Sequence, residues 1–367
     1  MKNKLIRQIG VGIVAALWLA LTLTAWFSPA KAFSDAERRP LKQFPELSGT
    51  TLLNGKFMKD FESYTLDQFP LRDPFRQVKS LFHYKVLQQK DNNKIYMEDG
   101  YAAKLEFPYN AQAVSHALGR FQFLYDNYLK NQGSRVYAAV VPDKGYYLAQ
   151  PNGYPVMDYS ALFDDVKQGM PWATHIDLTD LLSIEDYYFT DTHWRQEKIL
   201  DVAQRITETM GMAAPQAEDF RQTAVERPFY GVYYGQAALP MSPETMYLME
   251  SDVLDGCTVT IEGSKTAPVY DREKLNGKDL YEVFLSGSVS LAEIQNPNAR
   301  TDRELIIFRD SFGSSVAPLL VSQYQTVTLV DIRYLASPML KNFIDFHGQD
   351  VLFLYSTLVL NNGTTLK

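Results

Sequence analysis

Three short, largely apolar runs in the last third of the chain constrain its fold more than any other feature. They lie at residues 305–308, 327–330 and 351–354, and segments of helical pattern separate them. A strand with a continuous apolar run, rather than alternating apolar and polar residues, is covered on both faces. The sequence therefore predicts an α/β fold in which a mostly parallel sheet is flanked by helices.

The preceding part of the chain repeats this succession of helical and strand-like patterns. Apolar residues recur at helical spacing over residues 57–86, with a break at Pro70 that predicts two helices. A second amphipathic run, 111–129, leads directly into an apolar run at 136–141, as a helix leads into a buried strand. The further elements that we expect are a strand at 175–178 and a helix that follows Trp194 and reaches residue 210.

Residues 212–300 differ in character from the rest. They contain many turn-forming residues, Tyr and Thr, and no long helical pattern. This composition predicts a β-rich lobe inserted into the α/β domain at about 212–300.

The amino terminus indicates a membrane segment. Lys2, Lys4 and Arg7 precede an uncharged apolar run at residues 9–27, close to the roughly 20 residues that a helix needs to cross the hydrocarbon layer. By the positive-inside rule, the remainder of the chain faces away from the cytoplasm. Two fates remain open, because the Ala-Lys-Ala at 30–32 has the pattern of a signal-peptidase site. We favour an uncleaved anchor.

These patterns divide the chain into three parts. Residues 1–32 form the membrane anchor or signal segment, and the charged, proline-containing residues 33–56 form a juxtamembrane linker. Residues 57–367 form the main folded domain, with the β-rich insertion at about 212–300. We expect a single-pass protein of the cell membrane with an extracytoplasmic domain, or a secreted protein if the first segment is cleaved.

Composition argues against several functional classes. The net charge of -7 disfavours nucleic-acid binding, which requires clustered Lys and Arg. Cys257 is the only cysteine, so no internal disulfide can form. The sequence has no His-x-x-x-His, no Cys pair and no dense Asp cluster, and no glycine-rich loop follows a strand. We therefore expect no metal and no nucleotide cofactor.

One of the five histidines stands in a setting suited to catalysis. His193 follows Asp191 by two residues within the aromatic segment 187–194. A carboxylate at this spacing can hold the imidazole tautomer that a general base needs. The alternative is that Thr190 or Asp191 caps the helix that follows. Three of the remaining histidines, His83, His116 and His175, fall inside predicted regular elements without a nearby carboxylate pair or a second histidine, and His347 lies in a loop before Gly348, so all four are expected to be packing or surface residues.

Ser311 is the candidate nucleophile. It follows the predicted strand 305–308 and precedes a helical segment that begins at about residue 312. The carboxyl ends of strands form the usual ligand crevice of an open α/β sheet, where backbone N–H groups at a helix start can face a developing oxyanion. The alternative is that Ser311 only caps the helix.

Together the two segments resemble the SGNH-like acetyltransferases of exopolysaccharide assembly, namely the alginate O-acetyltransferase group and its DHHW relatives. Residues 190–194 (Thr-Asp-Thr-His-Trp) match the family's Asp-x-His-Trp motif, and residues 309–312 (Arg-Asp-Ser-Phe) resemble its Lys-Asp-Ser-Tyr/Phe motif. Other family landmarks are matched in the same order at residues 39–45, 68–73, 141–144 and 330–334. The resemblance covers the chain from about residue 38 to its end.

The resemblance implies a circularly permuted SGNH-hydrolase fold, with Ser311 as nucleophile, His193 as base and Asp191 as the carboxylate that orients the base. Our candidates for contacts with the substrate or the oxyanion are Gly287, Ser288, Arg309, Gly313 and Arg333. Two of these depart from the family pattern, because Arg309 replaces a Lys and Ser288 replaces an Asn. If that Asn donates to the oxyanion in relatives, this chain would have to use backbone N–H groups or Ser288 instead.

The implied activity is O-acetyl transfer to a secreted or cell-surface polysaccharide through an acyl-serine intermediate. Relatives work beside a membrane-bound O-acyltransferase, which relays the acetyl group across the membrane, and the anchor would keep the domain near such a partner. Two alternatives stay open. The same triad would serve an acetylesterase with water as acceptor, and the departure at Ser288 allows a non-catalytic polysaccharide-binding or scaffold subunit.

Overall fold

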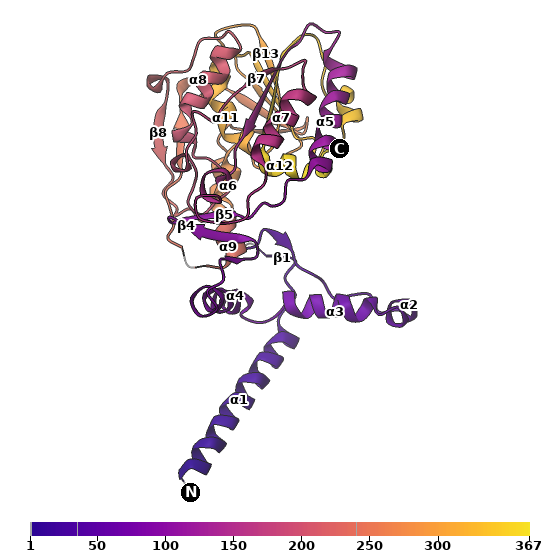
Figure 1. Cartoon of the computed structure of the whole chain (residues 1–367), viewed down its shortest axis with the longest axis vertical. Helices are drawn as coiled ribbons and strands as arrows, with labels where there is room; N and C mark the ends of the chain where they lie inside the picture. The colour runs from indigo at the N-terminus through magenta and orange to yellow at the C-terminus, as the bar shows by residue number, and fades with distance from the viewer. Residues whose placement is uncertain (1, 35, 240) are drawn as a thin grey trace. The chain divides into compact units, whose positions relative to one another are not determined.

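The computed structural model describes residues 2–34, 36–239 and 241–367, and side chains from residue 4 onward. The chain divides into two compact units. The smaller contains Met1–Asn92 together with Gly235–Pro240, and the larger contains Asn93–Tyr234 together with Met241–Lys367. Figure 1 shows the elements of each.

The larger unit is built on an eight-stranded sheet, counted over the described residues, with the strand order β11-β10-β12-β14-β13-β15-β6-β7. Its strands are β6 (Arg135–Val141), β7 (Thr174–Ile176), β10 (Thr258–Ile261), β11 (Lys265–Ala267), β12 (Leu291–Gln295), β13 (Glu304–Arg309), β14 (Thr326–Val330) and β15 (Asp350–Ser356). The strands from β14 to β7 pair in parallel, whereas β11, β10 and β12 extend one edge in antiparallel pairing. The predicted mixed α/β architecture with a large, mostly parallel sheet is confirmed.

Helices cover both faces of this sheet, as the continuous apolar strands require. The helices of the larger unit include α5 (Ala111–Leu124), α6 (Lys144–Leu148), α7 (Tyr159–Gly169), α8 (Leu200–Thr209), α10 (Asp252–Asp255), α11 (Phe312–Leu320) and α12 (Thr357–Asn361). Ile307 of β13 belongs to a core cluster that includes residues of α8 and α11. Its neighbour Ile306 belongs to a second cluster that includes residues of α5 and α7. Figure 1 shows these two pairs of helices on opposite sides of the strands.

The helix expected to follow Trp194 begins later than predicted. A 3₁₀ turn, η4 (Gln196–Lys198), comes first, and α8 starts only at Leu200. Gln196 is fully buried, and its side chain donates to the Ser315 carbonyl at 2.8 Å and accepts the Met249 N–H at 2.9 Å. These tertiary hydrogen bonds hold the segment in an irregular conformation that could not be predicted from its local sequence.

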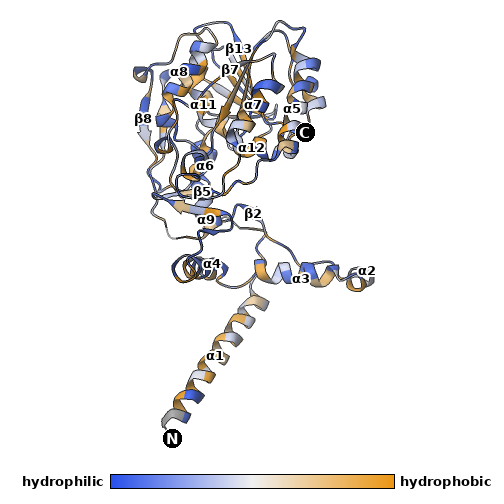
Figure 2. Cartoon of the chain, in the orientation of Figure 1, coloured by the Kyte–Doolittle hydropathy of each residue, from blue (hydrophilic) through white to orange (hydrophobic). Residues whose placement is uncertain are grey.

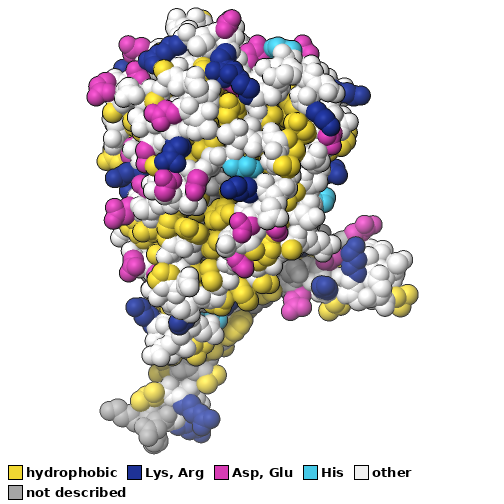
Figure 3. Space-filling model, turned by 45° about the horizontal axis from the view of Figure 1, so that its top comes forward, with side chains coloured by type: hydrophobic (Ala, Val, Ile, Leu, Met, Phe, Trp, Pro, Cys, Tyr) yellow, Lys and Arg dark blue, Asp and Glu magenta, His cyan; other side chains and the backbone are white. Residues whose placement is uncertain are grey.

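The segment expected as a β-rich lobe contributes in two ways. Its first strands, β8 (Arg221–Ala224) and β9 (Tyr247–Glu250), form a separate two-stranded antiparallel sheet. Its later strands, β10 to β12, belong to the edge of the main sheet. The predicted β content is therefore present, and the description of the segment as one inserted lobe stays a prediction. On the face drawn in Figure 3, charged side chains of both signs are interspersed.

The smaller unit begins with α1 (Lys2–Phe27), which is followed by α2 (Gly49–Leu53), α3 (Lys56–Asp67), α4 (Arg72–Leu81) and the π-helix η1 (Phe82–Val86). The two helices predicted over residues 57–86 are confirmed, with their break at residues 68–71. Within the predicted linker 33–56, β1 (Phe33–Ser34) and β2 (Arg39–Pro40) pair antiparallel. Residues 4–27 of α1 are long and apolar enough to cross a membrane, with a mean hydropathy of 2.0 over an 18-residue stretch, and Figure 2 shows this helix mostly in hydrophobic colours.

Candidate active site

Ser311 lies where β13 ends and α11 begins, at the carboxyl edge of the parallel strands. Its side chain makes no capping hydrogen bond to α11. Asp310 acts there instead, because its Oδ1 accepts the Phe312 N–H at 3.0 Å and its Oδ2 accepts the Ser356 N–H at 2.8 Å. The Ser311 side chain therefore does not cap α11, and its hydroxyl is left for another contact.

Asp191 and His193 lie in a closed loop. Tyr187 and Trp194 form an antiparallel bridge at the base of this loop, and the Tyr188 N–H donates to the His193 carbonyl at 3.1 Å. Within the loop, the His193 N–H donates to Asp191 Oδ1 at 3.1 Å. The loop therefore turns the carboxylate back toward the histidine two residues later.

The three predicted residues meet in space. His193 Nε2 is 2.7 Å from Ser311 Oγ, and His193 Nδ1 is 2.5 Å from Asp191 Oδ1. The other carboxylate oxygen, Asp191 Oδ2, accepts the Val232 N–H at 2.7 Å. Asp191 is fully buried and His193 almost so, whereas Ser311 is partly exposed. A hydroxyl, an imidazole and a carboxylate in this order have the geometry of an activated nucleophile with its base and orienting acid.

An aromatic ring that sequence analysis missed holds the imidazole from one side. The Tyr281 ring stacks on His193 with 3.8 Å between centroids and an interplanar angle of 6°. The Tyr281 hydroxyl is 2.8 Å from Ser315 Oγ, which also accepts the Trp194 Nε1–H at 2.8 Å. No motif marks Tyr281, because its relation to His193 arises only from the fold.

Two side chains of opposite charge, the buried Lys144 and the partly buried Glu244, hold the backbone of the loop just before Asp191. Lys144 Nζ donates to the carbonyls of Tyr188 and Phe189 at 2.9 and 3.3 Å. Glu244 accepts the N–H groups of Phe189 and Thr190, each at 2.9 Å. The carbonyls of this stretch therefore face a cation and its N–H groups face an anion.

Thr190 belongs to the same arrangement and is not a helix cap. Its hydroxyl donates to Glu244 Oε1 at 2.9 Å and accepts the Gly231 N–H at 2.9 Å. Gly231 also has to be a glycine, since a Cβ there would lie 2.3 Å from Asp191 Cβ. The alternative that Thr190 caps the following helix is wrong.

Burial shifts the pKa of each of these two side chains in the direction that favours its neutral form. Burial lowers the pKa of Lys144 to about 7, although the negative charges of Asp191, Glu244 and Asp143 oppose this shift. Burial also raises the pKa of Glu244, against the stabilising hydrogen bonds from the loop backbone. Lys144 lies in one of the family landmarks, residues 141–144, but neither residue was predicted as part of the site.

Gly287 and Ser288 have a less direct relation to the site. Gly287 has a positive φ of 88°, and Ser288 is exposed. Across the described residues, no hydrogen bond joins either of them to Ser311 or His193. Their predicted role in substrate or oxyanion binding stays a prediction.

Gly313 and Arg309 pack against each other beside Ser311. A Cβ on Gly313 would lie 2.6 Å from Arg309 Cβ, so the glycine permits this close approach. The Gly313 N–H donates to the Asp310 carbonyl at 3.1 Å. An oxyanion at Ser311 would have to compete with Asp310 for this N–H, as it would for the N–H of Phe312.

Arg309 and Arg333 share the carboxylate of Asp331. Arg333 donates to Asp331 from Nε at 2.9 Å and from Nη2 at 2.6 Å, and Arg309 Nη1 lies 3.9 Å from the same group. Burial opposes the charge on each arginine. It lowers the pKa of Arg309, whereas the hydrogen bonds to Asp331 outweigh it for Arg333 and raise its pKa. Asp331 directly follows β14, so this cluster lies at the same sheet edge as Ser311.

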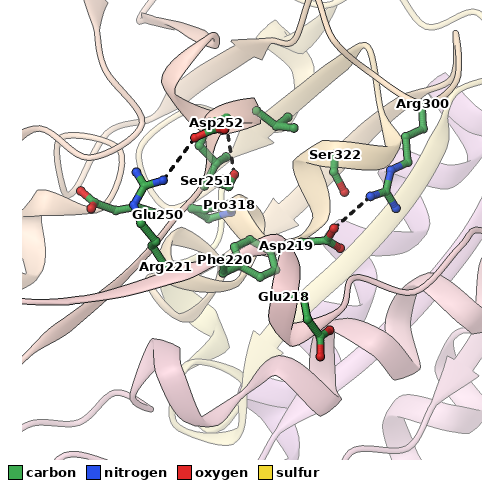
Figure 4. Close-up of a pocket in the computed structure, with 12 residues that line it drawn as sticks. Glu218, Asp219, Phe220, Arg221, Glu250, Ser251, Asp252, Arg300, Pro318 and Ser322 are labelled. Carbon is green, nitrogen blue, oxygen red and sulfur yellow. Dashed lines mark hydrogen bonds and ion pairs between the residues drawn. The ribbon is translucent and has the colours of Figure 1, made fainter.

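A half-open pocket of about 210 Å³ lies elsewhere in the larger unit. Figure 4 shows two pairs of opposite charge among its lining side chains, Arg221 with Asp252 and Arg300 with Asp219. It contains none of the predicted site residues. Within the described part of the chain, no group of three or more His, Cys, Asp or Glu side chains is arranged to hold a metal ion.

Residues 181–330, which contain both motifs, match the family model described as DHHW protein. This confirms the resemblance to the DHHW family. A comparison with curated proteins found no match.

Solved structures share the fold of the chain. A DHHW family protein from Eubacterium siraeum is 18% identical, with a TM-score of 0.59 over 75% of this chain and 94% of that one. Bacillus cereus PatB1 with a sulfonyl adduct is 18% identical, with a TM-score of 0.58 over 72% and 95% of the two chains. The O-acetyltransferase domain of Pseudomonas putida AlgJ is a more distant match, 16% identical, with a TM-score of 0.46 over 73% and 92% of the two chains.

Proposed function

We propose that this chain is an extracytoplasmic, SGNH-like serine O-acetyltransferase that acts on a secreted or cell-surface polysaccharide. The observation that supports this most is the continuous path of contacts from Ser311 Oγ through His193 to Asp191, at 2.7 and 2.5 Å. In such a path the base can remove the hydroxyl proton while the carboxylate holds the imidazole in the required tautomer. The DHHW match over both motifs adds to it.

The reaction runs in two steps. Ser311 Oγ attacks the carbonyl carbon of an acetyl donor while its proton passes to His193 Nε2, and the donor's leaving group departs with that proton. A sugar hydroxyl then attacks the acetyl-serine, gives its proton to His193 Nε2, and leaves as the acetyl ester while Ser311 recovers its proton. Asp191 stays ionised and stabilises the imidazolium formed in each step.

The same proposal covers location and partners. Residues 1–32 anchor the chain, 33–56 connect it to the membrane, and 57–367 form the catalytic domain, a circularly permuted SGNH fold with the insertion at 212–300. The helix that ends at Phe27 supports the anchor through its length and composition. A membrane-bound O-acyltransferase would supply the acetyl group, since acetyl-CoA is a cytoplasmic donor, and anchoring would raise its effective concentration near the site.

The test uses the purified full chain in detergent with 4-nitrophenyl acetate as donor, with and without acetyl-free oligosaccharides. We expect acetylated oligosaccharide and nitrophenol, both lost in Ser311→Ala and His193→Ala and retained in the matched control Ser314→Ala. PatB1 has been solved with a sulfonyl adduct, and a sulfonyl fluoride should likewise modify Ser311 here, as peptide mass spectrometry would show.

Two outcomes would contradict the proposal in different ways. Release of acetate that no oligosaccharide can capture would identify an esterase. Full retention of activity in Ser311→Ala, together with unchanged cell-surface acetylation in a strain that carries this variant, would favour a scaffold subunit without catalysis.

A further inference from the structure

Helix α4 turns its polar face toward its own unit. Arg72 and Arg76 form ion pairs with Glu37 at 2.6 and 3.2 Å. Arg76 also donates to the Gly235 carbonyl at 2.9 Å. One turn further, Ser80 is fully buried and donates to the Ala237 carbonyl at 2.7 Å. Arg72, Arg76 and Ser80 are spaced four residues apart and so lie on one side of the helix.

The apolar face of the same helix points outward. Leu71, Phe75, Val78 and Phe82 are separated by four, three and four residues, which places them in one stripe. They are 65, 47, 64 and 51% exposed, respectively. A surface helix of a soluble domain has the opposite arrangement, with its apolar stripe against the core and its charges in water. An apolar stripe left outside in this way marks an interaction surface.

The start of α4 is fastened close to the end of α1. The Gln68 side chain accepts the Lys31 N–H at 2.8 Å and donates to the Lys31 carbonyl at 2.9 Å. Lys31 is the fourth residue after Phe27, where α1 ends. Four extended residues span at most roughly 14 Å. The headgroup layer adds roughly 5 to 7 Å on each side of the hydrocarbon core. If α1 crosses the membrane, residue 68 is therefore held near this headgroup layer.

We propose that α4 and η1 lie in the membrane–water interface on the outer side, with the stripe from Leu71 to Phe82 at the boundary of the acyl chains. This inference rests on the anchoring by α1 that is part of the proposed function. Amphipathic interfacial helices combine such a stripe with basic residues that meet lipid phosphates. Lys79 and Lys85 are exposed on the same stretch and can do so.

Lipid is the partner that these observations favour over a protein. The bilayer is within reach, since Gln68, four residues before α4 begins, is hydrogen-bonded to Lys31, four residues after the span ends. The stripe is a single line of bulky side chains beside basic residues, which suits a flat, anionic interface. The arrangement gives the chain a second membrane contact that α1 alone does not supply.

The experiment places spin labels on the full chain in vesicles of phosphatidylcholine and phosphatidylglycerol that contain no other protein. In a Cys257→Ser background, labels are introduced through Val78→Cys in the stripe, Gln77→Cys on the flank of the same helix, and Leu17→Cys in α1. Collision with oxygen and with a water-soluble nickel complex gives the depth of each label. We expect the Val78 label about 5–10 Å into the interface, the Gln77 label in water and the Leu17 label in the hydrocarbon.

The possible results separate the two proposals. Equal exposure of the Val78 and Gln77 labels to nickel, with Leu17 in hydrocarbon, would refute the interfacial contact and leave the anchor intact. Shielding of Val78 that appears only when host membrane proteins are added would refute lipid as the partner and identify a protein instead. A water-exposed Leu17 label would refute the anchor and, with it, this inference. Unchanged ester hydrolysis in each labelled variant confirms that the domain is folded.

Discussion

Replacement of Asp191 by asparagine preserves the shape of the side chain and removes one of its acceptors. Asp191 Oδ1 serves both the N–H and the Nδ1 of His193, and Oδ2 serves the Val232 N–H. An amide must place its NH₂ group at one of these positions. Either the Val232 N–H then faces a donor, or the NH₂ faces His193 and forces the proton onto Nε2, where it blocks the contact that should activate Ser311.

The magnitude follows from the role of the carboxylate. Both amide orientations leave one backbone N–H facing a donor, so neither is strongly preferred, and the inactive tautomer is populated. Both also lose the negative charge that stabilises the imidazolium. A change of this kind in a Ser-His-Asp triad lowers kcat by about 10⁴-fold, which corresponds to about 5 kcal/mol of transition-state stabilisation.

The assay is hydrolysis of 4-nitrophenyl acetate by the purified chain, with Asp164→Asn as the matched control. Asp164 is an exposed residue of α7 whose side chain makes no hydrogen bond within the described residues, so its variant should retain wild-type activity. If Asp191→Asn stays within tenfold of wild type while its circular dichroism spectrum is unchanged, the proposed role of Asp191 is wrong.

Three further changes test the surroundings of the site. Tyr281→Leu removes the ring stacked on His193. An aromatic pair contributes roughly 0.5–1.5 kcal/mol, so this variant should lower kcat about 2- to 13-fold. Tyr281→Phe keeps the ring and should retain more activity, and equal losses in the two variants would argue against stacking. Glu244→Gln leaves one loop N–H facing an amide NH₂ group, so urea denaturation should show a loss of about 1–3 kcal/mol, and an unchanged midpoint would contradict the loop role of Glu244. Burial lowers the pKa of Lys144 from its ordinary 10.5 to about 7 in the folded chain. The unfolded chain therefore binds more protons between these two pH values, and stability rises with pH there. Lys144→Met abolishes this rise, so its stability relative to wild type should fall by about 1.4 kcal/mol per pH unit from pH 7 to 10, and a pH-independent difference would refute the lowered pKa.

The sheet could be predicted because each central strand carries its own evidence. The apolar runs at 305–308, 327–330 and 351–354 became β13, β14 and β15, since a strand buried on both faces needs no partner to be recognised. The position of Ser311 followed from the same reasoning, because the residue after such a strand lies at its carboxyl edge. The antiparallel edge formed by β10 to β12 could not be predicted, since short strands with mixed residues do not reveal which sheet they join.

The rest of the site depends on contacts between distant segments. Tyr281 stacks on His193, and Glu244 holds Thr190, across separations at which sequence spacing carries no information. A single aromatic or acidic residue looks the same in the sequence whether it packs in a core or supports a catalytic loop. Lys144 was noticed only within a family landmark, and its burial, which gives it a role, appears only in the fold.

The charged side chains around the loop stabilise one another electrostatically. A lysine as deeply buried as Lys144 would be costly in an apolar core, but here Asp191, Glu244 and Asp143 attract it and oppose the lowering of its pKa. The cation in turn holds the carbonyls of Tyr188 and Phe189. Because removal of one partner leaves the others without charge compensation in a poorly solvated site, the position of the Asp191 carboxylate depends on all of them. The loop is therefore fixed by electrostatics that act before a substrate arrives, which is the preorganisation that a nucleophilic serine requires.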